Sequence, residues 1–181
     1  SGSADHAIKI WNVSTGEQMR TLTGHSNTVW TLVMLPDGKL ASGSGDTTIK
    51  IWNVKTGEVI RTLTGHSHAV RSLAVLPDGS LASVSLDHTN KIWNVATGEL
   101  LRTLTGHSGW ISSIAALPNK RLASGSSDNT IKIWYVETGE LIRTLYGHSN
   151  YVYSLTVLPD GKLVSGSYDQ KIKIWHNPIS N

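Results

Sequence analysis

The sequence contains no cysteine and no phenylalanine among its 181 residues. The absence of cysteine excludes disulfide bonds and thiolate metal sites. No stretch approaches the ~18 uncharged apolar residues that a membrane-spanning helix needs, which predicts no membrane partner. No basic segment followed by an apolar one marks a secretory signal in this chain, and together with the lack of cysteine this predicts a cytoplasmic protein.

Charge and hydropathy are both moderate. Hydrophobic residues make up 39% of the chain, which argues against a disordered chain. The net charge is +3, and the basic residues recur with a regular period, which favours a solvated face of a scaffold. They are Lys9, Lys50, Lys91, Lys132 and Lys173, together with Arg20, Arg61, Arg102 and Arg143. No dense basic run with interleaved aromatics is present, so a nucleic-acid partner is not predicted.

The chain is a tandem repeat with a period of 41 residues. Tryptophan recurs at this spacing, as Trp11, Trp52, Trp93, Trp134 and Trp175. The predicted units are 1–23 (partial), 24–64, 65–105, 106–146 and 147–181 (partial) within a single array, 1–181. Units 24–64 and 65–105 are identical at 27 of 41 positions, which indicates recent amplification of the repeat or its design.

Within a unit the hydrophobic pattern has the period of β-strands. In unit 24–64 it predicts four strands, with turns at 36–38 and 56–58 where Gly, Pro and Asp gather. The expected strands are 29–35, 40–44, 48–54 and 59–64. Four short strands with tight turns predict a small antiparallel sheet in each unit. Such a sheet is apolar on both faces, so it must stack against copies of itself.

These residues resemble the WD40 repeat. The resemblance rests on Gly24-His25, Leu40–Ser44, Asp46 and Ile49–Trp52, and it recurs in each unit. It implies an all-β protein of β-propeller blades, each of four antiparallel strands, with about four blades in this chain. One departure is that the residue after the tryptophan is never aspartate: it is Asn12, Asn53, Asn94, Tyr135 or His176.

Each unit also holds one histidine, serine, aspartate and tryptophan at fixed spacing. They are His25, Ser42, Asp46, Trp52; His66, Ser83, Asp87, Trp93; His107, Ser124, Asp128, Trp134; and His148, Ser165, Asp169, Trp175. Ser, His and Asp together suggest a hydrolase. Four identical sets favour instead a part that each blade needs to fold, because catalysis requires one specialised site. The WD40 resemblance implies a hydrogen-bonded chain from Asp to His to Ser to the indole, and no catalytic residue is predicted.

Metal and cofactor sites are not predicted either. His66 and His68 could chelate a metal, but no third ligand repeats with them, which favours a surface location. Two further substitutions are local. Val84 replaces a strand glycine, and Asn90 places an amide where its counterparts are isoleucine, which predicts a weaker second blade unless the amide finds a partner.

Positions that vary between units are candidates for binding. In WD40 propellers the matching positions lie on the top face around the channel and contact partners. Here they include Trp30, Arg71, Trp110, Tyr151, Tyr153 and Tyr168. These residue types are enriched at binding hot spots, so an unknown protein or peptide is the expected ligand. Drift or aromatic packing on a strand is the alternative.

The number of blades raises a problem of ring closure. Propellers have ~4–8 blades and WD40 rings typically have seven, so four blades of this type would leave apolar end faces in water. We therefore expect a homodimer that forms an eight-blade ring, with strand 17–23 of one copy completing unit 147–181 of the other. The third strand would then be present twice at each junction, as 7–13 and 171–175, and the sequence offers no account of this.

The predicted function is a non-enzymatic scaffold or binding module that needs no cofactor. Two alternatives stay open. One is a fragment of a longer WD40 array that regulates a linked enzyme. The other is a carbohydrate-binding propeller with aromatic sites.

Overall fold

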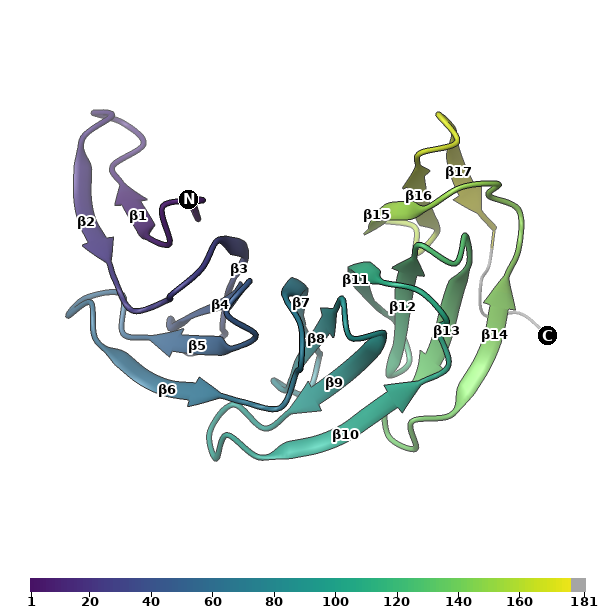
Figure 1. Ribbon diagram of the computed structural model, residues 1–181, viewed down its shortest axis with the longest axis horizontal. Coiled ribbons are helices and arrows are strands. Elements are labelled where there is room, and N and C mark those ends of the chain that lie inside the picture. The colour runs from purple at the N-terminus through teal and green to yellow at the C-terminus, as the bar shows by residue number, and fades with distance from the viewer. Residues whose placement is uncertain (177–181) are drawn as a thin grey trace.

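The computed structural model describes residues 1–176, and every regular element in this part of the chain is a β-strand. The strands form five antiparallel sheets in chain order (Figure 1). The first sheet has β1 (Ile8–Trp11) and β2 (Gln18–Leu22). The last has β15 (Val152–Val157), β16 (Leu163–Ser167) and β17 (Ile172–Trp175).

The three sheets between them each have four strands. The second comprises β3 (Val29–Met34), β4 (Leu40–Ser44), β5 (Ile49–Trp52) and β6 (Val59–Leu63). The third comprises β7 (Val70–Val75), β8 (Leu81–Ser85), β9 (Thr89–Trp93) and β10 (Leu100–Thr105). The fourth comprises β11 (Ile111–Leu117), β12 (Arg121–Ser126), β13 (Ile131–Tyr135) and β14 (Leu141–Leu145). The predicted all-β class with blades of four antiparallel strands is confirmed.

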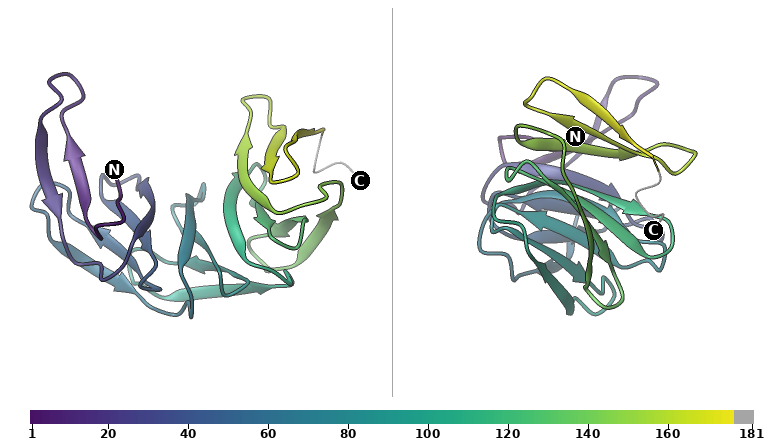
Figure 2. Two further views of the ribbon diagram at one scale, coloured as in Figure 1. Left: turned by 45° about the horizontal axis from the view of Figure 1, so that its top comes forward. Right: turned by 90° about the vertical axis from the view of Figure 1, so that its right-hand side faces the viewer.

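The sheets are arranged as an arc. The first strands of the sheets, β3, β7, β11 and β15, line its concave side, and the last strands, β6, β10 and β14, form its convex rim (Figure 1). The two ends of the arc, β1–β2 and β15–β17, stand apart in Figure 1 and in the left view of Figure 2. The described residues therefore form an open arc of stacked blades.

The third strand of each blade is shorter than its hydrophobic pattern predicts. Residues 48–54 were expected to be extended, whereas β5 ends at Trp52. Asn53 starts a turn there, because its Oδ1 accepts hydrogen bonds from the backbone N–H groups of Lys55 and Thr56 at 3.0 and 3.2 Å. Gly57 completes the turn with a φ of +87°, which favours glycine.

The core consists of separate clusters between neighbouring sheets. Ile49 and Ile51 of β5 pack with Val70, Leu73 and Leu81 of the next sheet, and all five are buried. Equivalent residues join the third sheet to the fourth and the fourth to the fifth. Each sheet is thus apolar on both faces, which is why the blades stack.

Asn90 and Val84 meet directly in the third sheet. They are cross-strand partners, and both are fully buried. At the equivalent Gly43, an added Cβ would lie 2.7 Å from the Thr31 methyl carbon. In the third sheet Ser72 lies opposite Val84 where Thr31 lies opposite Gly43, so the contact with the Thr31 methyl group has no counterpart there. Only one end of the Asn90 amide is hydrogen-bonded. Its Nδ2 donates to the Leu104 carbonyl at 3.4 Å, while its Oδ1 has no partner among the described residues.

Replacing Asn90 with leucine, which has a similar shape, is expected to raise the free energy of unfolding by about 1–2 kcal/mol. The substitution removes a buried carbonyl that lacks a hydrogen bond, although leucine is larger than asparagine and has to fit beside Val84. Urea denaturation measures the change. The matched control is Ile49→Asn at the equivalent fully buried position of β5, which should lower stability by about 2–5 kcal/mol. An Asn90→Leu variant that is destabilised even when Val84→Ala relieves the crowding would contradict this account of the orphaned carbonyl.

No helix occurs within residues 1–176, and accordingly none there could cross a membrane.

Candidate functional site

The structure brings the histidine, serine, aspartate and tryptophan of each unit together. In the second sheet, His25 Nδ1 lies 2.7 Å from Asp46 Oδ2, and His25 Nε2 lies 2.7 Å from Ser42 Oγ. The Trp52 indole N–H donates to the same Ser42 Oγ at 2.7 Å. The other three sets repeat these contacts at 2.7–2.9 Å.

A single arrangement of protons satisfies every member of the set. The indole donates to Ser42, the Ser42 hydroxyl donates to His25 Nε2, and His25 Nδ1–H donates to an ionised Asp46. Asp46 also accepts from the Ser26 backbone N–H and from Thr48. The set thus ties a loop, two strands and a turn into one blade.

The serine of the set is unsuited to nucleophilic attack. Ser42 and its counterparts Ser83, Ser124 and Ser165 are fully buried, so no substrate could reach the hydroxyl. Ser44, the other serine of β4, lies outside the set: its Oγ donates to the Asn27 carbonyl at 3.0 Å and accepts from the Asp46 backbone N–H at 3.1 Å. This geometry resembles a Ser-His-Asp triad in its contacts but lacks its access.

The aspartates of the sets are strongly acidic. Burial by itself would raise the pKa of Asp46, but hydrogen bonds from Thr48, His25 and the backbone outweigh it and lower the pKa to about 2. The pKa of Asp169 is likewise about 2, where the hydrogen bond from His148 outweighs the raising effect of burial. The same balance lowers the pKa values of Asp87 and Asp128.

Two of the histidines are held neutral. Burial lowers the pKa of His25 below its ordinary value and outweighs the opposite effect of Asp46. Burial lowers the pKa of His66 in the same way against the effect of Asp87. Each of these blades therefore contains an ionised aspartate beside a neutral imidazole.

The aromatic and arginine side chains that vary between units form two groups. In the first, the guanidinium carbon of Arg71 lies 3.8 Å from the ring centroid of the exposed Trp30, a cation–π contact between neighbouring blades. In the second, Tyr168 stacks on Tyr151 at 5.4 Å between ring centroids and contacts Tyr153 at 5.0 Å. Tyr151 also hydrogen-bonds Ser112 of the preceding blade. Trp110 is exposed and belongs to neither ring group in the described part of the chain.

Several of the repeated basic residues form hydrogen bonds to other strands or to the next blade. Arg61 reaches into the next blade and donates to the carbonyls of Ala96 and Thr97 at 2.8 and 2.7 Å, and Arg20 donates to the Thr56 carbonyl at 3.0 Å. Lys91 is buried, and its Nζ donates to Thr103 Oγ1 of the neighbouring strand. The predicted solvated face therefore describes these residues only in part: Arg20 is exposed and Lys91 is buried, and their hydrogen bonds connect strands and blades.

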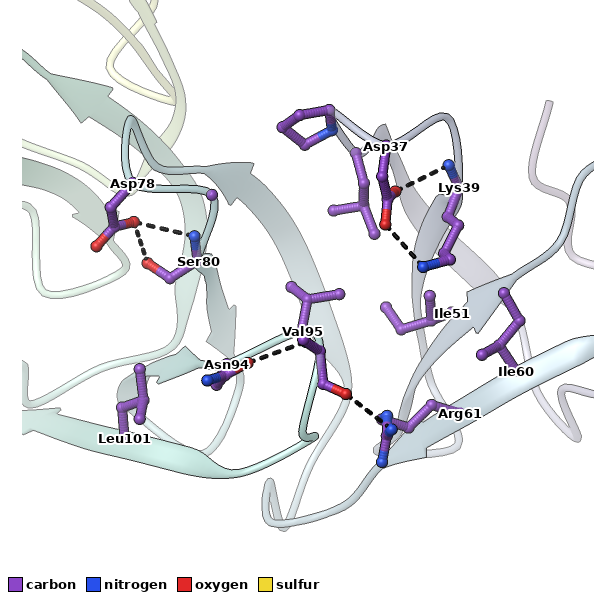
Figure 3. A pocket seen from close by; sticks show the side chains of 14 residues that line it. Asp37, Lys39, Ile51, Ile60, Arg61, Asp78, Ser80, Asn94, Val95 and Leu101 are labelled. Atoms are coloured by element: carbon purple, nitrogen blue, oxygen red, sulfur yellow. Dashed lines mark hydrogen bonds and ion pairs between the residues drawn. The ribbon is translucent and has the colours of Figure 1, made fainter.

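A groove of about 480 Å³ lies between the second and third sheets (Figure 3). Its lining includes Ile51, Ile60 and Val95, with Arg61 on one wall. The polar groups shown there already have partners: Asp37 with Lys39, Asp78 with Ser80, and Arg61 with the turn that follows Val95. The groove offers apolar surface and few unpaired polar groups to a ligand.

The described residues contain no cluster of three or more histidine, cysteine, aspartate or glutamate side chains that could hold a metal. His68, the second member of the His66-x-His68 pair, contacts Ser67 Oγ instead, while His66 is committed to Asp87 and Ser83. The two histidines therefore do not form a chelating pair.

Comparison with known proteins agrees with this architecture. The sequence profile of the family "WD domain, G-beta repeat" matches residues 16–53, 57–94, 98–135 and 139–176. The crystal structure of the WD40 β-propeller domain of Doa1 superposes with a TM-score of 0.86 at 29% identity, over 97% of this chain and 60% of that one.

Two similar curated proteins each match over the length of a single repeat. The Lissencephaly-1 homolog of Caenorhabditis briggsae is 54% identical over 39 residues, which are 22% of this chain and 10% of that protein. Nuclear distribution protein PAC1-2 of Postia placenta is 44% identical over 39 residues, or 22% and 9%. The matched part is thus about a tenth of each relative. The four profile matches together cover more than half of the chain, and the protein belongs to the WD40 repeat family.

Proposed function

We propose that the protein is a non-enzymatic WD40 scaffold that a second copy completes into a closed ring of about eight blades. The absence of an accessible nucleophile in the four buried sets favours the non-enzymatic part. The ring is supported by one observation at the end of the arc, the exposed isoleucines of β17.

Ile172 and Ile174 of β17 are 78% and 53% exposed. Their equivalents one unit earlier, Ile131 and Ile133, are fully buried against the next blade. β17 also pairs only with β16 in the described chain, whereas β13 pairs on both sides. The last blade therefore presents an apolar face and a strand edge of the kind that adjacent blades cover elsewhere in the arc.

A second copy supplies the matching surface. β2 has the same place in its blade as β6, β10 and β14, the strands that cover the edges of β5, β9 and β13. The partner's β2 would pair with β17, and the partner's second sheet would cover Ile172 and Ile174. Two such junctions related by a two-fold axis close the ring.

Replacing Ile174 with aspartate is expected to convert the dimer to a monomer, because a charge would lie in the apolar junction. Light scattering coupled to size exclusion measures the mass. The matched control is Ile60→Asp on the rim strand β6, where the side chain is also exposed and lies away from the junction. A monomeric wild type at micromolar concentration, with an intact fold by circular dichroism, would disprove the ring.

We further propose that the exposed aromatic side chains bind a protein or peptide. Arg71 over Trp30 and the Tyr151–Tyr153–Tyr168 cluster combine rigid rings with a cation, which suits such partners. Peptides selected from a displayed library are expected to lose at least about tenfold in affinity on Tyr153→Ala. They should be unaffected by Tyr146→Ala on the outer side of the fourth blade. Selection of glycans instead, or equal effects of both changes, would argue against this surface.

A further inference from the structure

The two ends of the arc contain nearly the same segment. Residues 1–11 (SGSADHAIKIW) and 165–175 (SGSYDQKIKIW) are identical at 8 of 11 positions. They lie four repeat periods apart, which is the number of blades by which a second copy would be displaced in the proposed ring. Either segment could therefore fill the same position in the ring, which is the position beside β2.

Within its own chain, segment 1–11 occupies the position beside β2. Gly2 bridges to Ile8, and Ser1 exchanges two backbone hydrogen bonds with Lys9, at 2.8 and 2.7 Å. β1 pairs with β2, and Ile8 is buried in a cluster with Val29, Leu40 and Trp52 of the second sheet. Gly2 also lies against Val29. The segment thus covers the free face of the second sheet.

The bonds that hold this segment are weaker than those of its copy. Trp11 is 45% exposed, and its indole N–H reaches Ser1 Oγ only at 3.2 Å. This set includes no histidine in the described residues, whereas Trp175 belongs to a complete set with Ser165 and His148.

β2 is anchored independently of β1. Arg20 donates to the Thr56 carbonyl of the second sheet, and Leu22 is buried in the cluster with Leu40 and Trp52. Departure of β1 would leave β2 in place with a free edge. That edge accepts a strand with the sequence Ile-Lys-Ile-Trp, which β17 also carries.

We propose that β1 occupies in cis the docking site for β17 of a second copy, so that ring closure requires β1 to leave. The site consists of the edge of β2 and the face formed by Leu22, Val29, Leu40 and Trp52. The inference rests on the proposed ring and accounts for the duplicated third strand. After the exchange, β2 belongs to a four-stranded blade with the partner's β15, β16 and β17, which contains the buried His148 of the partner subunit. Before the exchange, β2 belongs to the two-stranded sheet with β1.

An engineered disulfide tests the exchange directly. Lys9 and Thr21 are cross-strand partners, and both backbone groups of Lys9 bond to Ser1 rather than to β2. Such a pair places its Cα atoms ~4.5 Å apart, within the range of a disulfide. Because the chain contains no cysteine, Lys9→Cys/Thr21→Cys can form only this bond within one chain, and oxidation at low protein concentration with a check by non-reducing electrophoresis excludes bonds between chains.

The oxidised variant is expected to stay monomeric at concentrations where its reduced form is dimeric, as measured by light scattering. The matched control is Lys91→Cys/Thr103→Cys, the equivalent pair in the third sheet, which should dimerise in both redox states. A second variant lacking residues 1–11 should have a dimer dissociation constant lower than that of the full chain by about tenfold or more.

The outcomes separate the two proposals. If the oxidised variant dimerises as strongly as its reduced form, the displacement of β1 is overturned while the ring stands. If the full chain is monomeric but the shortened chain dimerises, the ring proposed for the full chain is overturned, while the occupation of the docking site by β1 stands. If the shortened chain is folded and monomeric, both proposals are overturned.

Discussion

Replacing Trp134 with alanine is expected to lower the free energy of unfolding by about 3–5 kcal/mol. The side chain is buried in the cluster that joins the third and fourth sheets. Its indole N–H also donates to Ser124, and its ring packs against Gly106, which holds the loop before β11. The substitution would remove a core side chain, the hydrogen bond to Ser124 and the packing of the indole against Gly106.

The chain provides its own control for this experiment. Trp11 has the same place in the first sheet but is partly exposed, so Trp11→Ala should cost about 1 kcal/mol or less. Urea denaturation followed by far-ultraviolet circular dichroism measures both variants without relying on tryptophan fluorescence. Equal losses would show that the buried sets do not carry the stability of the blades.

Stability is expected to fall in two stages on acidification. The pKa values of His25 and His66 are lowered by burial from the ordinary 6.5, so protonation favours the unfolded chain. Their contribution is complete above about pH 6.5 and is lost as the pH falls toward their folded pKa values. The aspartates act lower: the contribution of Asp46 is present above its ordinary pKa of 3.8 and is lost as the pH falls through about 2.

Thermal and urea unfolding between pH 8 and pH 2 would measure both stages. The control is Asp46→Asn, which keeps the shape of the side chain and its acceptor oxygen but removes its titration. This variant should be less stable at neutral pH and should show a smaller loss below about pH 4. A stability that rises on acidification anywhere in this range would contradict the assignment of neutral histidines and ionised aspartates.

Much of the fold was predictable because it depends on local pattern. The period of 41 residues, the alternation within each unit and the turn residues predicted four-stranded antiparallel sheets. The four His-Ser-Asp-Trp sets were also located by spacing, because the blade holds these positions at constant distances along the chain. The choice of Ser42 rather than Ser44 followed from strand alternation and the spacing of the resemblance, and the structure places Ser42 beside His25 and Trp52.

Contacts between units could not be predicted from the repeat period or from residue spacing. Arg61 binds carbonyls of the following blade, and the tyrosines of the last blade stack on one another. Asn90 and Val84 are cross-strand partners, so the two substitutions meet in one buried place. A period shows which residues are alike, whereas these interactions depend on which side chains meet across an interface.

The repeated residues specify the strands and turns within a blade, whereas the contacts of each blade depend on its neighbours in space. The same four residues, Ile-Lys-Ile-Trp, form β1 and β17. Ile8 is buried in the first copy because the second sheet covers it, and Ile172 is exposed in the last because no described sheet follows. Burial is a property of neighbours in space, so identical strands differ in energy and in their capacity to bind a second chain.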